Sequence, residues 1–115
     1  MTKKKICWIT STYLLDVDIP IVPVLQVDYD IDWIVLTTTA NQDGDKVLIE
    51  TRGCRNYKLV IDEGIFIHPK KFFFYWKFVK EIKKQNYDLY YFDFIGTPYF
   101  IPVVQMLLPK DKCVI

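Results

Sequence analysis

Four short apolar segments have the pattern of buried strands. Residues 6–10 are apolar between a run of lysines and a polar loop, and residues 32–37 are rich in residues that favour strands. Residues 88–92 and 112–115 show the same short apolar pattern. A continuous apolar run of this length is typical of a strand that is covered on both faces, as in a parallel sheet.

Longer segments between these strands predict helices. Residues 19–29 are apolar, with Pro20 suited to a first helical turn and Asp18 suited to its N-cap. Residues 11–18 before them predict a loop. Residues 98–108 predict another helix, which begins at a proline.

The clearest helix begins at His68 and Pro69, continues to about Gln85 and ends at Asn86. Apolar residues recur along it at helical spacing, which predicts that one side packs on the sheet. This predicted core stripe comprises Phe72, Tyr75, Trp76, Val79 and Ile82.

The segment between the second strand and this helix is ambiguous. Residues 41–45 form a turn cluster of polar residues and glycine. Residues 47–51 and 57–61 are two further strand candidates, separated by residues 52–56. They predict either a hairpin or one irregular edge strand.

The order of these elements defines a fold class. Strands that alternate with helices predict an α/β domain with a mostly parallel sheet and helices on both faces. We expect a Rossmann-like, doubly wound, three-layer domain with the strand order 3-2-1-4-5. In such a sheet the ligand crevice lies at the carboxyl ends of the first and fourth strands.

Composition narrows the class of protein further. The 115 residues fit a single domain, and 51% of them are hydrophobic, which excludes a disordered chain. A formal net charge of +1 argues against a dedicated nucleic-acid binder. The three cysteines have no paired spacing, so we expect buried thiols in a reducing compartment.

The two ends of the chain carry expectations of their own. The lysines at residues 3–5 precede an apolar run, as in a signal peptide. The run is too short for one, and polar residues follow it. No run reaches the roughly 18 apolar residues of a membrane span, so we expect a cytoplasmic protein. Residues 113–115 begin an apolar strand at the end of the chain, so we expect a truncated half of a longer enzyme.

Several stretches together resemble a known enzyme family. They are Lys-Lys-Ile-Cys-Trp-Ile-Thr-Ser at residues 4–11, Asp-Val-Asp-Ile-Pro at 16–20, Ile-Asp-Trp-Ile-Val at 31–35 and the unit from residue 78 to 115, with Gly-Thr-Pro-Tyr at 96–99. The pattern resembles the N-terminal half of family-4-type glycosyltransferases of the GT-B fold, which act in bacterial polysaccharide assembly. The resemblance covers nearly the whole chain.

The sequence departs from the family pattern in two places. The family often has a Gly-Gly loop after the first strand, where backbone approaches the substrate, whereas residues 13–16 contain no glycine. The family's donor-binding signature, with its paired glutamates, lies in a C-terminal half, which we expect to be missing here.

The resemblance implies a function for the domain. It would be the acceptor-side half of a hexosyltransferase and inactive alone, because the nucleotide-sugar donor binds the missing C-terminal domain. The fragment itself would carry no cofactor. Its partners would be that donor domain and a glycan or lipid-linked sugar acceptor, and the enzyme would lie in the cytoplasm or at the inner face of the membrane, without nucleic acid.

Polar residues after the first strand are candidate acceptor contacts. Ser11, Thr12 and Asp16 follow the strand at the edge where such sheets bind ligands. Asp16 and Asp18 are the candidate general bases, since a carboxylate near an acceptor hydroxyl could take its proton. The alternative is a solvated loop in which Asp18 only caps the helix.

A second group follows the fourth strand. Asp93, Gly96 and Thr97 face the same predicted crevice, where the glycine allows close approach and the helix N-terminus favours anionic or hydroxyl-rich groups. The alternative is a strand-to-helix turn that needs a glycine for its geometry.

The helix from residue 69 has a second face. Lysines and aromatic rings there predict contact with an anionic membrane surface. The residues are Phe73, Phe74, Lys77, Lys80 and Lys84. The alternatives are a solvated lysine face and a surface that packs against the missing half.

Other chemistry is less well supported. His68 has no partners in a catalytic order, Arg52 and Arg55 suit surface charge more than a phosphate site, and no metal-ligand spacing occurs. The main alternative function is a stand-alone flavodoxin-like or receiver-like module, which a bound flavin would reveal. A third is a non-catalytic interaction domain that uses the aromatic and lysine face.

Overall fold

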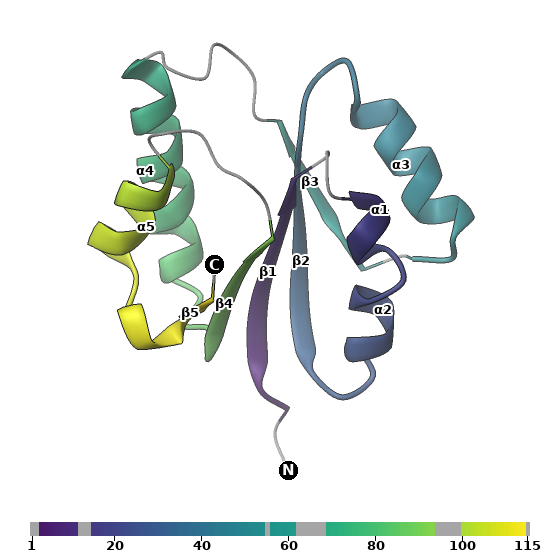
Figure 1. The fold of residues 1–115 in the computed structure, drawn as a ribbon, viewed down its shortest axis with the longest axis horizontal. Coiled ribbons are helices and arrows are strands. Elements are labelled where there is room, and N and C mark those ends of the chain that lie inside the picture. The colour runs from purple at the N-terminus through teal and green to yellow at the C-terminus, as the bar shows by residue number, and fades with distance from the viewer. Residues whose placement is uncertain (1–2, 12–14, 55, 62–68, 94–99, 115) are drawn as a thin grey trace.

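Five parallel strands form a single sheet in the order β3-β2-β1-β4-β5, with helices on both of its faces (Figure 1). The computed structural model describes residues 3–11, 15–54, 56–61, 69–93 and 100–114, without the side chains of residues 16, 69–72, 93, 100 and 101. This Rossmann-like, three-layer arrangement and its strand order confirm the expected fold class.

The strands lie close to where the apolar runs predicted them. The central strand β1, Lys5–Ser11, is almost fully buried and pairs with β2, Asp30–Thr37, and with β4, Leu89–Asp93. The edge strands are β3, Lys58–Ile61, and the two-residue β5, Cys113–Val114, which follows a 3₁₀ turn.

Helix α3, Gln42–Thr51, corrects the prediction of a strand at residues 47–51. Strands β2 and β3 are parallel, and parallel neighbours need a crossover rather than a hairpin. The sequence suits a helix there, because Asp43 and Asp45 in its first turn interact favourably with the helix dipole. A three-residue apolar run could not decide between the two structures.

The predicted helix at residues 19–29 is in fact two short helices. Helix α1, Leu15–Asp18, lies within the expected loop, and α2, Val22–Leu25, follows after a turn. Pro20 lies in that turn, since proline has no backbone N–H to continue the hydrogen bonds of α1. Pro23 lies in the first turn of α2, where proline is tolerated.

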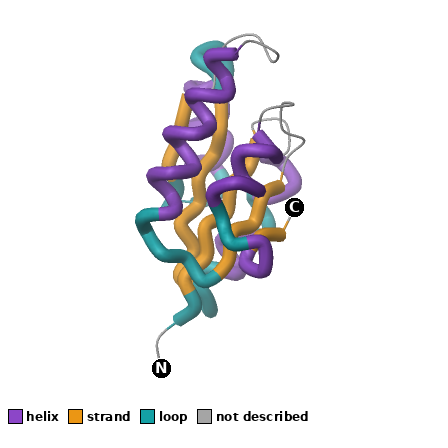
Figure 2. Tube along the Cα trace, turned by 90° about the vertical axis from the view of Figure 1, so that its left-hand side faces the viewer, coloured by secondary structure: helices purple, strands orange, loops and turns teal. Residues whose placement is uncertain are grey.

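Helices α4, Pro69–Lys83, and α5, Phe100–Leu107, cover the other face of the sheet, as predicted (Figure 2). Tyr75, Val79 and Ile82 of the predicted α4 stripe are buried, and Trp76 packs partly against the same core. The side chain of Phe72 lies outside the described residues. Asn86 ends the helical segment with a positive φ of 54°, a conformation that asparagine tolerates.

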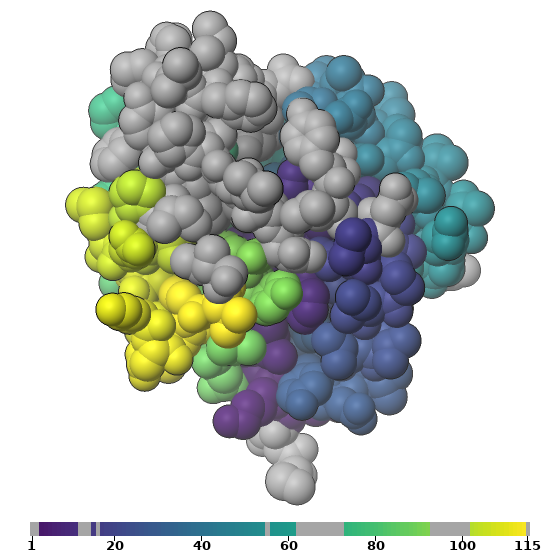
Figure 3. Space-filling view, in the orientation of Figure 1, coloured from purple at the N-terminus to yellow at the C-terminus, as the bar shows by residue number. Residues whose placement is uncertain are grey.

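Two apolar clusters hold the layers together. One lies between the sheet and α4 and α5 and includes Ile9, Tyr75 and Phe92. The other lies under α1, α2 and α3 and includes Trp8, Leu15 and Trp33. In Figure 3 the green atoms of β4 reach the surface between α5 and the layer of α1 and α2.

Candidate functional site

The carboxyl ends of β1 and β4 form the edge where this fold class binds ligands. The chain passes from β1 through β2 to β3 on one side, and β4 and β5 lie on the other side of β1. Ligands of doubly wound sheets bind at such a reversal. Thr10 of β1 is in register with Asp93 of β4, so the ends of the two strands are direct neighbours.

The topology brings several predicted contacts to this carboxyl edge. Ser11 is the last residue of β1 and is half-buried, and Asp93 is the last residue of β4. Asp16 is the second residue of α1, the helix that follows this edge. The described residues exclude Thr12, Gly96 and Thr97, and also the side chains of Asp16 and Asp93.

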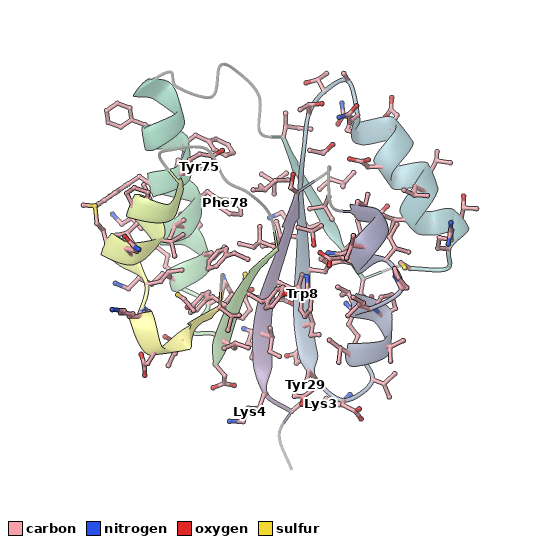
Figure 4. All side chains as sticks on the ribbon, in the orientation of Figure 1. Lys3, Lys4, Trp8, Tyr29, Tyr75 and Phe78 are labelled. Atoms are coloured by element: carbon pink, nitrogen blue, oxygen red, sulfur yellow. The ribbon has the colours of Figure 1, made fainter. Side chains whose placement is uncertain are left out.

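A buried polar cluster lies beside this edge, between β1, β2 and α1. The Thr10 hydroxyl donates to Asp18 Oδ2 at 2.5 Å, and Trp8 Nε1 donates to the same oxygen at 3.2 Å. Trp33 Nε1 donates to the Thr10 hydroxyl oxygen at 2.9 Å. Figure 4 shows Trp8 between the sheet and the α1–α2 layer. The cluster therefore ties α1 to the two central strands.

The burial of Asp18 corrects the prediction that it caps the following helix. Asp18 ends α1, whereas the N-cap of α2 is Ile21, which makes no side-chain cap hydrogen bond. Only 1% of Asp18 is exposed, so its carboxylate has no open path to an acceptor hydroxyl. Its observed role is to hold α1 against β1.

A second threonine repeats this arrangement at the carboxyl end of β2. The Thr37 hydroxyl donates to Asp45 Oδ2 of α3 at 2.6 Å, and Thr37 is 1% exposed. In both pairs the aspartate follows the threonine by eight residues. Each pair fastens a helix to the strand that precedes it, and this stiffens the carboxyl edge.

The sequence pattern alone did not indicate the structural role of these two threonines. Thr10 and Thr37 each end an apolar run, and a threonine in that position is not by itself a specific signal. The available signal was the repeated spacing of a strand-end threonine and an aspartate eight residues later. Trp8 and Thr10 also share one face of β1, because side chains alternate along a strand.

Helix α4 exposes most of the predicted membrane face. Phe73 is 70% exposed, and Lys77, Lys80 and Lys84 are exposed, with Lys84 paired to Glu81 at 3.4 Å. Phe74 differs from the expectation, because it is half-buried against the core and stacks on Phe78 at 6.2 Å between ring centroids. None of the helices in the described part of the chain is long and apolar enough to span a membrane.

Among the described residues, the structure adds no evidence of a functional site at the remaining candidates. Arg52 is exposed at the end of α3, next to Gly53, whose φ of 82° suits glycine. Arg55 and His68 lie outside the described residues. Within the described ranges, no three His, Cys, Asp or Glu side chains come together in a way that could hold a metal ion.

The largest shifts of pKa among the described groups lie away from the carboxyl edge. Burial, with a smaller contribution from its register partner Asp32, raises the pKa of the Cys7 thiol to about 12. Burial and a hydrogen bond to Asp32 raise the pKa of Tyr87. Both groups are therefore neutral at physiological pH, and Cys7 is not an activated nucleophile.

Comparison with protein-family models, with curated proteins and with solved structures finds no match to this chain. The fold defines a Rossmann-like domain, and its strand order places the candidate ligand site at the carboxyl ends of β1 and β4.

Proposed function

We propose that this chain is the acceptor-side domain of a nucleotide-sugar-dependent glycosyltransferase, and that transfer requires a second, donor-binding half. The observation that carries the proposal is that Ser11 and Asp93 end the adjacent strands β1 and β4 at the topological reversal of the sheet. The resemblance of residues 4–11, 16–20, 31–35 and 78–115 to family-4-type glycosyltransferases supplies the chemistry. A glycan or a lipid-linked sugar would be the acceptor.

The proposal gives each residue at the edge a role. Ser11 and Asp93, with Thr12, Gly96 and Thr97, would hydrogen-bond acceptor hydroxyls. Asp16 is the proposed base, which takes the proton as the acceptor hydroxyl attacks the sugar carbon and the nucleoside diphosphate leaves. Asp18 would act only through the position of α1, since it is buried.

The two threonine–aspartate pairs support an edge of fixed shape. Thr10 with Asp18 and Thr37 with Asp45 hold α1 and α3 at the ends of their strands. A preformed site loses less conformational entropy when it binds a ligand. The ends of β1 and β2 and the helices that follow them would therefore keep their arrangement without the ligand.

The strand order differs from that of the alternative, a flavodoxin-like or receiver-like module. Those folds have the order 2-1-3-4-5, with β1 next to β3. Here β1 lies between β2 and β4, as in the Rossmann arrangement. The absorbance spectrum of the purified protein tests the alternative directly, because a bound flavin would absorb in the visible range.

Nuclear magnetic resonance titration tests the proposed function. We expect simple acceptor glycosides to shift the backbone amide signals of Ser11, Asp16 and Asp93, and uridine and guanosine diphosphates to leave them unchanged. Ser11→Ala should weaken the glycoside response, and the surface variant Thr51→Ala should not. Binding of either nucleotide at this edge would show that the domain is not the acceptor side.

A further inference from the structure

The amino edge of the sheet, opposite the carboxyl edge, carries two adjoining cavities. One cavity of about 430 Å³ lies between β2, the segment before β3 and the end of α4. The other, also about 430 Å³, includes Lys3, Gln26 and Tyr29. Ile31, Asp32 and Asn56 line both, so we name the pair the amino-edge groove. Figure 4 shows Lys3 and Tyr29 at this end of the molecule.

The walls of the amino-edge groove are held by hydrogen bonds between distant segments. Gln26 Nε2 donates to the backbone oxygens of Ile31 at 3.3 Å and Asn56 at 3.1 Å. The Tyr87 hydroxyl donates to Asp32 Oδ2 at 2.5 Å. The groove is therefore formed before any ligand arrives, and its size falls in the range of small-molecule sites.

One aromatic ring, that of the half-buried Tyr57, offers surface to the groove, whereas Trp33 and Tyr87 are buried behind it. Trp33 Nε1 donates to Thr10, the Tyr57 hydroxyl donates to Glu50, and the Tyr87 hydroxyl donates to Asp32. An aromatic ring whose polar atom is satisfied contributes apolar contact to a ligand.

Exposed amides supply the polar contacts of the groove. The residues Asn56 and Gln85 line it and are exposed, and each amide side chain can both donate and accept. The Asp32 carboxylate offers about four acceptor positions, of which the Tyr87 hydroxyl takes one.

The charges around the groove do not favour an ion of either sign. The charged residues that line it are two lysines, Lys3 and Lys58, and three acidic residues, Asp30, Asp32 and Glu81. Part of this charge is engaged nearby: Lys3 donates to a backbone oxygen, and Glu81 pairs with Lys84, just after the end of α4. With Glu81 paired to Lys84, two lysines remain beside two aspartates, and such balanced charge does not attract strongly charged ligands.

We propose that the amino-edge groove binds a neutral polyhydroxylated ligand, a sugar ring or a short glycan. The Tyr57 ring would cover an apolar C–H face of a sugar, and the exposed amides of Asn56 and Gln85 and the Asp32 carboxylate would bond its hydroxyls. The seven residues of β1 separate the groove from the crevice by roughly 20 Å, so the proposal stands independently of the acceptor site.

Titration with neutral methyl glycosides of glucose, galactose, mannose and N-acetylglucosamine tests this site by the same resonance method. At least one should shift the amide signals of residues 56–58 and 81–87 with millimolar affinity. Asn56→Ala and Gln85→Ala should each weaken binding at least about fivefold, which is the worth of one hydrogen bond. Gln105→Ala, an exposed amide on α5, should bind as the parent does.

Other results would overturn the proposal. Signals at residues 56–58 and 81–87 that no glycoside shifts would exclude a sugar site, and unchanged affinity in both amide variants would place the sugar elsewhere. A stronger response to spermidine than to every glycoside would make the groove a cation site. Binding at the carboxyl edge would shift the amide signals of Ser11, Asp16 and Asp93, whereas binding in the groove would shift those of residues 56–58 and 81–87. Each proposal can therefore fail without the other.

Discussion

At the scale of single residues, two hydrogen bonds, one buried and one partly buried, have the same construction. Thr10 and Thr37, near the ends of neighbouring strands, each donate to an aspartate eight residues further along the chain. Each bond replaces the water that the hydroxyl and carboxylate lose on burial. The pairs place α1 and α3 against the sheet and so shape the edge where a ligand would bind.

Removing the Asp18 carboxylate should destabilise the protein. Asp18→Ala leaves the donors of Trp8 and Thr10 without their acceptor, and an unsatisfied buried donor costs about 1–3 kcal/mol. We expect the free energy of unfolding to fall by about 2–4 kcal/mol in urea titrations followed by tryptophan fluorescence.

Two further variants separate the hydrogen bonds from general effects. Asp18→Asn keeps an acceptor oxygen and should lose less stability than Asp18→Ala. Asp28→Ala removes an exposed carboxylate and should change stability by no more than about 0.5 kcal/mol. Equal losses in the Asp18→Ala and Asp28→Ala variants would contradict the assigned role.

The Cys7 thiol should make stability depend on alkaline pH. Its pKa rises from the ordinary 9.0 to about 12 on folding, so the native state retains a proton that the unfolded chain releases. Its contribution is complete below pH 9 and is lost as the pH rises from 9 to 12. The parent's free energy of unfolding should fall relative to Cys7→Ala by about 1.4 kcal/mol per pH unit in this window.

Denaturant titrations of both proteins at a series of pH values measure this difference. The variant also removes apolar volume, but that cost does not depend on pH and cancels in the slope. A constant difference between the two proteins across the window would show that the thiol is not protected.

At the scale of elements, α4 combines a packing face with an exposed basic face. Tyr75, Val79 and Ile82 contact the core, whereas Phe73 and the lysines remain exposed. Phe74 belongs to the packing side through Phe78, which leaves Phe73 as the described exposed ring of the basic face. The face thus combines one exposed aromatic ring with three lysines.

This face should bind anionic membranes. Lysines near such a surface contribute about 1 kcal/mol each, so Lys77→Ala should weaken binding to phosphatidylglycerol vesicles about fivefold. Phe73→Ala should also weaken it, through the lost apolar insertion. Co-sedimentation with vesicles measures both effects.

Two controls test membrane binding: a lysine variant on another helix and vesicles without net charge. Lys46→Ala removes an exposed lysine of α3, on the opposite layer, and should bind as the parent does. Phosphatidylcholine vesicles should retain little protein. Equal binding by Lys77→Ala, Phe73→Ala and the parent would remove the membrane proposal and leave a solvated face.

At the scale of the whole molecule, β1 is the structural centre. It pairs with β2 on one side and β4 on the other, whereas β3 and β5 each pair with one described strand. Both apolar clusters include residues of β1. Opening this strand therefore disrupts both layers at once, and opening an edge strand does not.

Hydrogen exchange should follow this order. We expect the amides of Cys7–Ile9 to exchange most slowly and those of β3 and β5 to exchange earlier, because local openings release edges first. Mass spectrometry of peptic fragments resolves these segments. Protection of β5 equal to that of β1 would contradict a stability centred on β1.

Much of the architecture could be predicted from local pattern. Apolar runs gave the four predicted strands, helical spacing gave α4, and the alternation of the two gave the parallel sheet and its order. Ser11 and Asp93 could be assigned to one edge because strand ends in a parallel sheet share an edge. These features depend on neighbours within a few turns of chain, which a sequence displays directly.

Tertiary structure decided what local pattern could not. Residues 47–51 became helix because β3 pairs in parallel with β2, and Asp18 became buried because Trp8, Thr10 and α1 meet around it. The amino-edge groove joins Asp32, Asn56 and Gln85, which are far apart in the sequence. Burial and cavities come from contacts between distant segments, and no window along the chain contains both partners of such a contact.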